Sequence, residues 1–157
     1  MASKIGQENL QKLLEARTTL LEKAFEAVDV DQVMAWQSKG IRFDDVSLGK
    51  FDMDYAALEA MCTENFSHMT SLRVVKSTTS GNTPEFVTWE MDIEIVNKED
   101  EPALGIRKGQ PIPLKGIAVQ WWRWEGEGNE WDGDVSEKGV RGWEVLKEND
   151  YFIPART

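Results

Sequence analysis

The sequence predicts an α+β fold in which a strongly curved antiparallel sheet wraps around an N-terminal helix and leaves a cone-shaped cavity. Two observations carry this prediction. Apolar residues recur every three or four positions through the first 70 residues, and at every second position in most segments after residue 72. A sheet that follows helices must cover its apolar face with them. The 157 residues, of which 41% are hydrophobic, suffice for one domain over residues 1–157.

Three helices are expected in the first 70 residues, a long one over residues 10–28 and two further short ones, with a short strand over residues 41–45 before the third. Asp29 or Asp31 can cap the second helix, and Asp52 or Asp54 can cap the third, because a carboxylate there accepts the free N–H groups of the first turn. The first helix has one apolar face, which is formed by Leu10, Leu13, Leu14, Leu21, Ala24, Phe25 and Val28.

The strands follow from alternation of apolar and polar side chains. In residues 86–96, Trp89 and Met91 alternate with Glu90 and Asp92, which is typical of a strand with one buried face. Prolines and glycines mark residues 98–113 and 125–142 as loops. The expected strands are residues 41–45, 72–79, 86–96, 114–124 and 143–152.

Charge and composition exclude several classes of function. The net charge of −10, from 18 Lys and Arg against 28 Asp and Glu, disfavours nucleic acid and anionic lipid as partners. No apolar run is long enough to span a membrane, and the N-terminus has no secretory leader, so a cytoplasmic protein is expected. Cys62 and His68 are the only residues of their types, so no metal site is expected. No glycine-rich phosphate loop is present, and we expect no cofactor.

Four segments carry a resemblance to a known fold family. They are residues 26–36 (EAVDVDQVMAW), 41–49 (IRFDDVSLG), 116–124 (GIAVQWWRW) and 142–151 (GWEVLKENDY). In this order, and over nearly the whole chain, the sequence resembles the nuclear transport factor 2-like superfamily, and within it the SnoaL-like polyketide cyclases and ketosteroid isomerases. The superfamily contains enzymes of several reaction types and also structural modules, so the resemblance alone leaves the function open.

The resemblance implies two catalytic positions. Asp44 is similar to the proton-shuttling aspartate of the ketosteroid isomerases, and Gln120 occupies the position of their oxyanion-stabilising acid. We expect Asp44 to face the cavity as the base and Asp45 to point to the opposite face, although both can also be ordinary surface acids. The Gln120 amide would bind a carbonyl oxygen. The family's tyrosine is replaced by Leu20 or Leu21, which argues against steroid-type isomerisation.

Further acid–base candidates are His68, Glu90 and Asp92. His68 ends the third helix and could carry protons near neutral pH, or could simply interact with the last helical carbonyls. Glu90 and Asp92 share a strand face with Glu94. If that face lined the cavity, their repulsion would raise a pKa and form a cluster similar to that of epoxide-hydrolysing members. The alternative is that they face water or a dimer interface, because the opposite face is apolar.

Aromatic residues indicate an apolar ligand. The chain has seven tryptophans, and Trp122 and Trp124 share a strand face with Gln120. We expect Trp122, Trp124, Leu21 and Phe66 to contact an apolar small molecule.

The sequence thus leads to two hypotheses. The first is a cofactor-independent cyclase, isomerase or dehydratase that acts by proton transfer on an apolar oxygenated metabolite, polyketide- or terpenoid-like. The second is a non-catalytic module of the same fold that binds a small ligand or dimerises. In either case a homodimer through the outer sheet face is expected.

Overall fold

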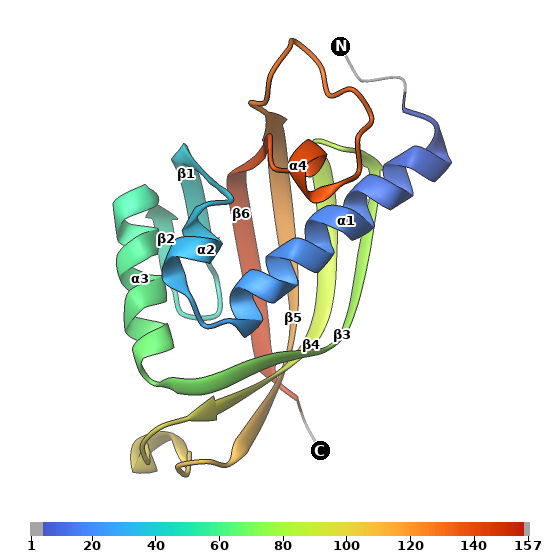
Figure 1. The fold of residues 1–157 in the computed structure, drawn as a ribbon. Coiled ribbons are helices and arrows are strands. Elements are labelled where there is room, and N and C mark those ends of the chain that lie inside the picture. The colour runs from blue at the N-terminus through green and yellow to red at the C-terminus, as the bar shows by residue number, and fades with distance from the viewer. Residues whose placement is uncertain (1–4, 156–157) are drawn as a thin grey trace.

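The computed structural model describes residues 5–155 and has the predicted α+β architecture, with a curved, open six-stranded sheet around α1 (Figure 1). The 20-residue α1 crosses the concave side of the sheet. The elements are α1 (Gln7–Glu26), α2 (Val30–Met34), β1 (Gln37–Asp45), β2 (Lys50–Met53), α3 (Tyr55–Ser67), β3 (Met69–Thr83), β4 (Phe86–Asn97), the 3-10 helix η1 (Pro102–Leu104), β5 (Pro111–Trp124), α4 (Glu137–Val140) and β6 (Trp143–Pro154).

The strand order is β2-β1-β6-β5-β4-β3, and all neighbours are antiparallel except β1 and β6. The parallel β1–β6 pair joins the first strand of the chain to the last. Its register places Asp44 beside Asn149 and Asp45 beside Asp150. Two segments from opposite ends of the chain therefore end side by side.

The core lies between α1 and the concave face of the sheet. Leu13, Leu14 and Leu21 of α1 are almost fully buried there, as the apolar face of the sequence predicts. Arg17 falls within the same face and is only 1% exposed. Burial of the apolar side chains stabilises the fold by about 1.5–3 kcal/mol for each large residue.

The segment 125–142 is more ordered than the predicted flexible loop. It contains α4, and Trp131 and Val140 pack into the core from it. Two other boundaries also differ from expectation. β2 forms a hairpin with β1 where no strand was expected, and β3 continues through the expected turn to Thr83.

The structure shows which of the two candidate acids caps each of the two short helices. Asp29 accepts a hydrogen bond from the Gln32 N–H (3.2 Å) at the start of α2. Asp54 accepts one from the Ala57 N–H (2.9 Å) at the start of α3.

Replacement of the α3 cap should therefore destabilise the protein. We expect Asp54→Ala to lower the free energy of unfolding by about 1 kcal/mol, because an N–H of the first turn loses its acceptor. Chemical denaturation measures this difference. Asp54→Asn is the matched control and should be nearly neutral; an equal loss in both variants would show that the carboxylate acts by charge rather than as a cap.

No helix among the described residues is both long enough and apolar enough to cross a membrane.

Candidate functional site

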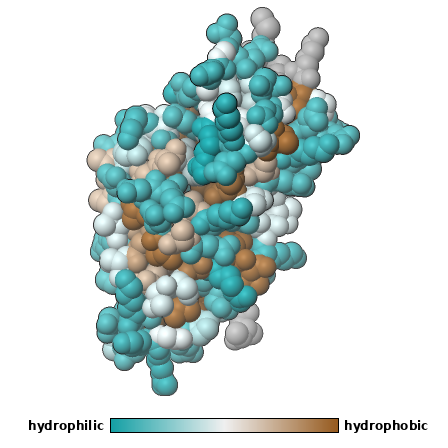
Figure 2. Space-filling view, in the orientation of Figure 1, coloured by the Kyte–Doolittle hydropathy of each residue, from teal (hydrophilic) through white to brown (hydrophobic). Residues whose placement is uncertain are grey.

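A cavity of about 520 Å³ opens between α3, the end of α1 and the concave sheet. Most of its wall is apolar, and apolar side chains are visible between polar ones in the lower half of the molecule (Figure 2). The exposed members of the wall, among them Leu48, His68 and Leu104, mark its mouth. The deeper apolar wall includes Phe25, Phe66, Trp89, Met91, Ile93, Ala118 and Phe152.

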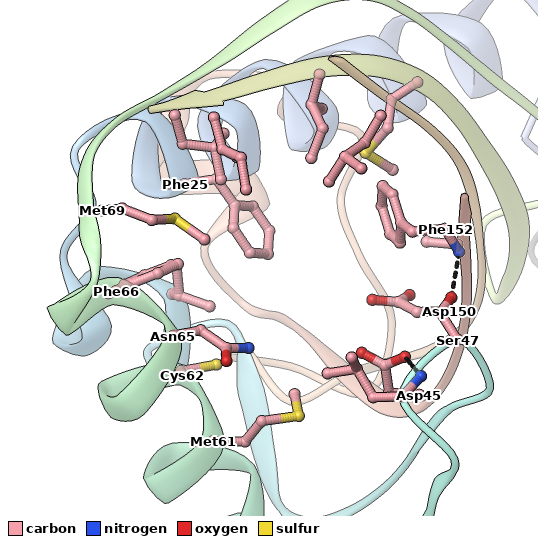
Figure 3. A pocket seen from close by; sticks show the side chains of 18 of the residues that line it. Phe25, Asp45, Ser47, Met61, Cys62, Asn65, Phe66, Met69, Asp150 and Phe152 are labelled. Atoms are coloured by element: carbon pink, nitrogen blue, oxygen red, sulfur yellow. Dashed lines mark hydrogen bonds between the residues drawn. The ribbon is translucent and has the colours of Figure 1, made fainter. Parts of the chain in front are cut away.

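Four carboxyl groups interrupt this apolar wall: Asp45 from β1, Glu148 and Asp150 from β6, and Glu101 from the segment after β4. Figure 3 shows Asp45 and Asp150 together on one side of the cavity, both pointing inward. The parallel register of β1 and β6 places these two residues next to each other. The Asp45 carboxylate is oriented by the Leu48 N–H, which donates to it over 2.9 Å.

A β-bulge turns Glu148 and Asp150 inward. The pairing of β6 with β5 shifts between Val145 and Lys147, so that Leu146 is an extra residue. Val145 before the bulge is fully buried and Glu148 after it is 4% exposed, three positions apart. A bulge adds one residue and so reverses which alternate side chains face the core.

Burial raises the pKa values of both β6 carboxyl groups. For Glu148, desolvation raises the pKa, and hydrogen bonds with Asp150 and Gln120 oppose this. For Asp150, desolvation raises the pKa well above its ordinary value, and the nearby charges of Glu148 and Asp45 raise it further. Two neighbouring acids in an apolar wall cannot both ionise easily, and of the two the pKa of Asp150 is raised well above its ordinary value.

A hydrogen-bond chain behind the cavity orients this pair. The Trp122 indole N–H donates to the Gln120 amide oxygen (3.1 Å), which leaves the Gln120 amide N–H to donate to Glu148 Oε2 (2.9 Å). An indole has no acceptor, so the direction of the chain is set from Trp122 onward. The Gln120 amide N–H favours the ionised form of Glu148 and so opposes the rise of its pKa.

Comparison with known proteins identifies the type of fold. No protein-family model matches the sequence, and no curated protein matches it. Solved structures do match. A proposed polyketide cyclase from Xanthomonas campestris pv. campestris superposes with a TM-score of 0.65 at 16% identity, over 91% of each chain. A proposed SnoaL-like polyketide cyclase from Shewanella denitrificans gives 0.61 at 9% identity, over 94% of this chain and 92% of the other.

The fold is therefore the one found in these SnoaL-like structures. A protein with a ketosteroid isomerase-like fold from Catenulispora acidiphila, solved in complex with trimethylamine, also matches, with a TM-score of 0.54 and 11% identity over 85% of this chain and 82% of the other. At these identities the likeness concerns the fold, so the function must be argued from the residues of the cavity.

Within the SnoaL-like fold, Asp45 and not Asp44 faces the cavity, so the predicted orientation of this pair is corrected. Asp44 is absent from the cavity wall and accepts a hydrogen bond from the Asp52 N–H (2.7 Å). The physical reason is the pleat of β1: Ile41 and Phe43 are buried, and Asp45 follows on the same face. Asp44 thus stabilises the β1–β2 hairpin.

Glu90 and Asp92 lie on the outer face of β4, which corrects their assignment to a cavity cluster. Glu90 is exposed, and Asp92 pairs with Lys115 on the neighbouring strand (3.5 Å). The cavity side of β4 is formed instead by Trp89, Met91 and Ile93. The apolar face covers the core because that burial stabilises the sheet.

Gln120 and Trp122 do share the inner face, and both are nearly fully buried, as their alternation predicts. Neither belongs to the cavity wall, however; Gln120 donates instead to Glu148, which does line the cavity. The expected direct contact of Gln120 and Trp122 with a ligand is therefore replaced by a supporting position.

The remaining predicted residues divide between the cavity and the core. His68 lines the cavity at its mouth, where it is the C-cap of α3, and Phe66 lines it from the same helix. Leu21 is 2% exposed and packs in the core. The Trp124 ring packs edge-to-face on Trp143, with centroids 5.7 Å apart, away from the cavity wall.

Sequence reasoning missed Glu148, Asp150 and Asn65. Asn65 points into the cavity from α3, across from Asp45 and Asp150 (Figure 3), where its amide can donate to a ligand oxygen.

Cys62 lies beside Asn65, but burial raises the pKa of this thiol to about 12, which leaves it a poor nucleophile. Among residues 5–155, no group of three or more His, Cys, Asp and Glu side chains could hold a metal ion.

Proposed function

We propose that this protein is a cofactor-independent enzyme of the cyclase, isomerase or dehydratase type, which transfers protons on an apolar oxygenated metabolite. The observation that carries the proposal is the pair of carboxyl groups of Glu148 and Asp150 in the apolar cavity wall, with the pKa of Asp150 raised well above its ordinary value. Groups whose environments separate their pKa values are suited to act as an acid and a base. Matching structures described as proposed polyketide cyclases support the same general class.

In this proposal Asp150 is the general acid. It donates its proton to a carbonyl or hydroxyl oxygen of the bound molecule. Asp45 or Glu148 then removes a proton from carbon, and Asn65 holds the oxygen from the opposite wall. Such steps lead to an enol, to loss of water or to ring closure, depending on the substrate, and none of them needs a cofactor.

The cavity also limits the substrate. Its wall is largely apolar and its ionisable groups are mostly acids, so a substrate with its own carboxylate or phosphate would be repelled and would lose its hydration. A volume of about 520 Å³ is in the usual range for a small-molecule site. An uncharged polyketide- or terpenoid-like molecule that carries a ketone or hydroxyl group fits these conditions.

Hydrogen exchange at carbon tests the proposal even where the final product of the reaction is not identified. The protein would be incubated in D₂O with a panel of apolar ketones, hydroxyketones and lactones, and deuterium incorporation would be followed by NMR and mass spectrometry. Incorporation that requires Asp150 supports the enzyme. Saturable binding across the panel with no exchange and no new product would instead support the non-catalytic ligand-binding module.

Gln120 should act as a positioning residue for the acid pair. In Gln120→Leu, Glu148 loses a hydrogen bond that favours its ionised form, so its pKa should rise. We expect turnover to fall about 10- to 100-fold, as for the loss of a hydrogen bond to a charged group. The rising limb of the pH–rate profile should move to higher pH. A lower rate with an unchanged profile would assign Gln120 a purely structural role.

We also propose a homodimer through the outer face of β5 and β6. Ile117, Tyr151 and Ile153 are 39%, 46% and 65% exposed on that face, and Ile117 is paired with Tyr151. Apolar groups that are adjacent on an open sheet favour association. Light scattering should give twice the mass of the chain, and Ile153→Lys should shift the protein toward the monomer; a wild-type monomer at high concentration would contradict the proposal.

A further inference from the structure

Arg17 is a buried cation on the side of the core that does not line the cavity. Its side chain leaves the middle of α1 and is 1% exposed. Its guanidinium carbon lies 4.2 Å from the ring centre of Trp122 and 5.0 Å from that of Trp143. The two indole faces stabilise the charge, but a guanidinium also has five N–H donors at its edge.

None of these donors has an acceptor among the described residues. The Nε and both terminal nitrogens of Arg17 are buried without a hydrogen-bond partner. The Gln120 amide oxygen accepts from the Trp122 indole N–H of this cluster and makes no hydrogen bond with Arg17. Glu85 is the acid that acts on Arg17 through space, and it forms no ion pair with it. A buried cation without a hydrogen-bonded counter-charge is costly, so this cluster requires an explanation.

The aromatic residues around Arg17 add donors and no acceptors. Trp36 packs on Trp122 with centroids 6.0 Å apart, and Trp124 packs on Trp143. The indole N–H groups of Trp36, Trp124 and Trp143 are all buried without partners. An anion would supply both the missing acceptor and a counter-charge, whereas a water molecule supplies no charge.

We propose that the Arg17–tryptophan cluster binds a small inorganic anion of halide size, held by the guanidinium edge and by neighbouring indole N–H groups. The ion is small because Arg17, Trp36 and Trp143 are each at most 3% exposed, which leaves no path for a metabolite. Burial lowers the pKa of Arg17 to about 9, so the charge that attracts the anion is present at pH 7. The site is separate from the acid pair and does not depend on the proposed reaction.

Thermal unfolding in chloride tests this site. The wild-type protein would be unfolded in mixtures of sodium chloride and sodium gluconate at one ionic strength, because general screening also affects a chain of net charge −10. A ligand that binds only the folded state raises the melting temperature. Chloride at a concentration about tenfold above its Kd should raise the melting temperature by about 3–6 °C, and the rise should level off at higher chloride concentrations.

Two variants assign the effect to Arg17. Arg17→Met keeps the length and apolar packing of the side chain and should abolish the chloride dependence. Arg141→Met is the matched control, because Arg141 also lies over an indole (4.5 Å from the centre of Trp36) but is exposed, and this variant should keep the full response. A chloride response that persists in Arg17→Met, or a flat wild-type response, would overturn the proposal.

Crystals grown in bromide provide a second measurement that needs no variant to fold. An anomalous peak within about 4 Å of the Arg17 guanidinium, the range of a hydrogen-bonded bromide, supports the site. Peaks only at exposed lysines and arginines would show an adventitious ion only and would overturn it.

Discussion

Asp150→Asn is expected to lower turnover by about 10²–10⁴-fold, the usual contribution of a general acid. The substitution keeps the size of the side chain and its ability to donate to Glu148, but removes the proton that can be transferred. The rate constant for deuterium exchange or product formation, measured at saturating substrate, gives the size of the loss. KM should change little, because the amide fills the same part of the cavity wall.

Asp44→Asn is the matched control for this experiment. Asp44 is on the same strand as Asp45 but accepts a hydrogen bond from the Asp52 N–H, which an asparagine oxygen can also accept. Its turnover should stay near the wild-type value. The reverse result, a large loss in Asp44→Asn and none in Asp150→Asn, would return the base to the residue that the resemblance indicates and would remove β6 from the mechanism.

The same Asp150→Asn substitution is expected to stabilise the protein at neutral and alkaline pH. The pKa of Asp150 is raised in the folded protein from its ordinary value of 3.8, so the folded state binds this proton more tightly than the unfolded chain. The resulting stability is fully present below about pH 4 and is lost as the pH rises through the raised value. An asparagine does not titrate and avoids this loss.

We therefore expect Asp150→Asn to unfold at a higher temperature than the wild-type protein at pH 8, because the wild-type protein has lost the stability that the bound proton gives. At pH 4 the two proteins should unfold at nearly the same temperature. The prediction is wrong if the difference between them is constant from pH 4 to pH 8, or if the variant is the less stable protein at pH 8.

The lower turnover and the higher stability expected for Asp150→Asn describe a residue that serves the reaction and makes the folded protein less stable. A carboxyl group placed in an apolar wall is destabilising unless it stays protonated. Loss of activity together with a gain in stability in one variant is a result that a purely structural role for Asp150 would not produce.

Much of the architecture could be predicted from local pattern. Apolar residues recur with a period of 3.6 in α1 and of 2 in β4 and β5, because these are the side chains that face the core. This burial is a property of each element by itself, so it can be predicted from the local sequence. The same reasoning correctly placed Gln120 and Trp122 on the inner face. It also contained the signal for Asp45, since Ile41 and Phe43 precede it at alternate positions, but the resemblance favoured Asp44 instead.

The acid pair, in contrast, depends on a bulge that alternation does not reveal. Continuing the buried positions Trp143 and Val145 along β6 would put Lys147 and Asn149 inside and Glu148 and Asp150 outside. The extra residue at Leu146 reverses this order. Its position is set by the pairing of β6 with β5, which is an interaction between strands and not a property of either segment.

The sequence by itself determined the fold class, the first three helices and the inner faces of β4 and β5, because these follow from burial and hydrogen bonding over a few neighbouring residues. Only the tertiary structure decided the site. The parallel contact of β1 with β6 places Asp45 beside Asp150, and Gln120 orients Glu148. Raised pKa values arise when distant segments enclose a charge and exclude water, so they exist only once the chain has folded.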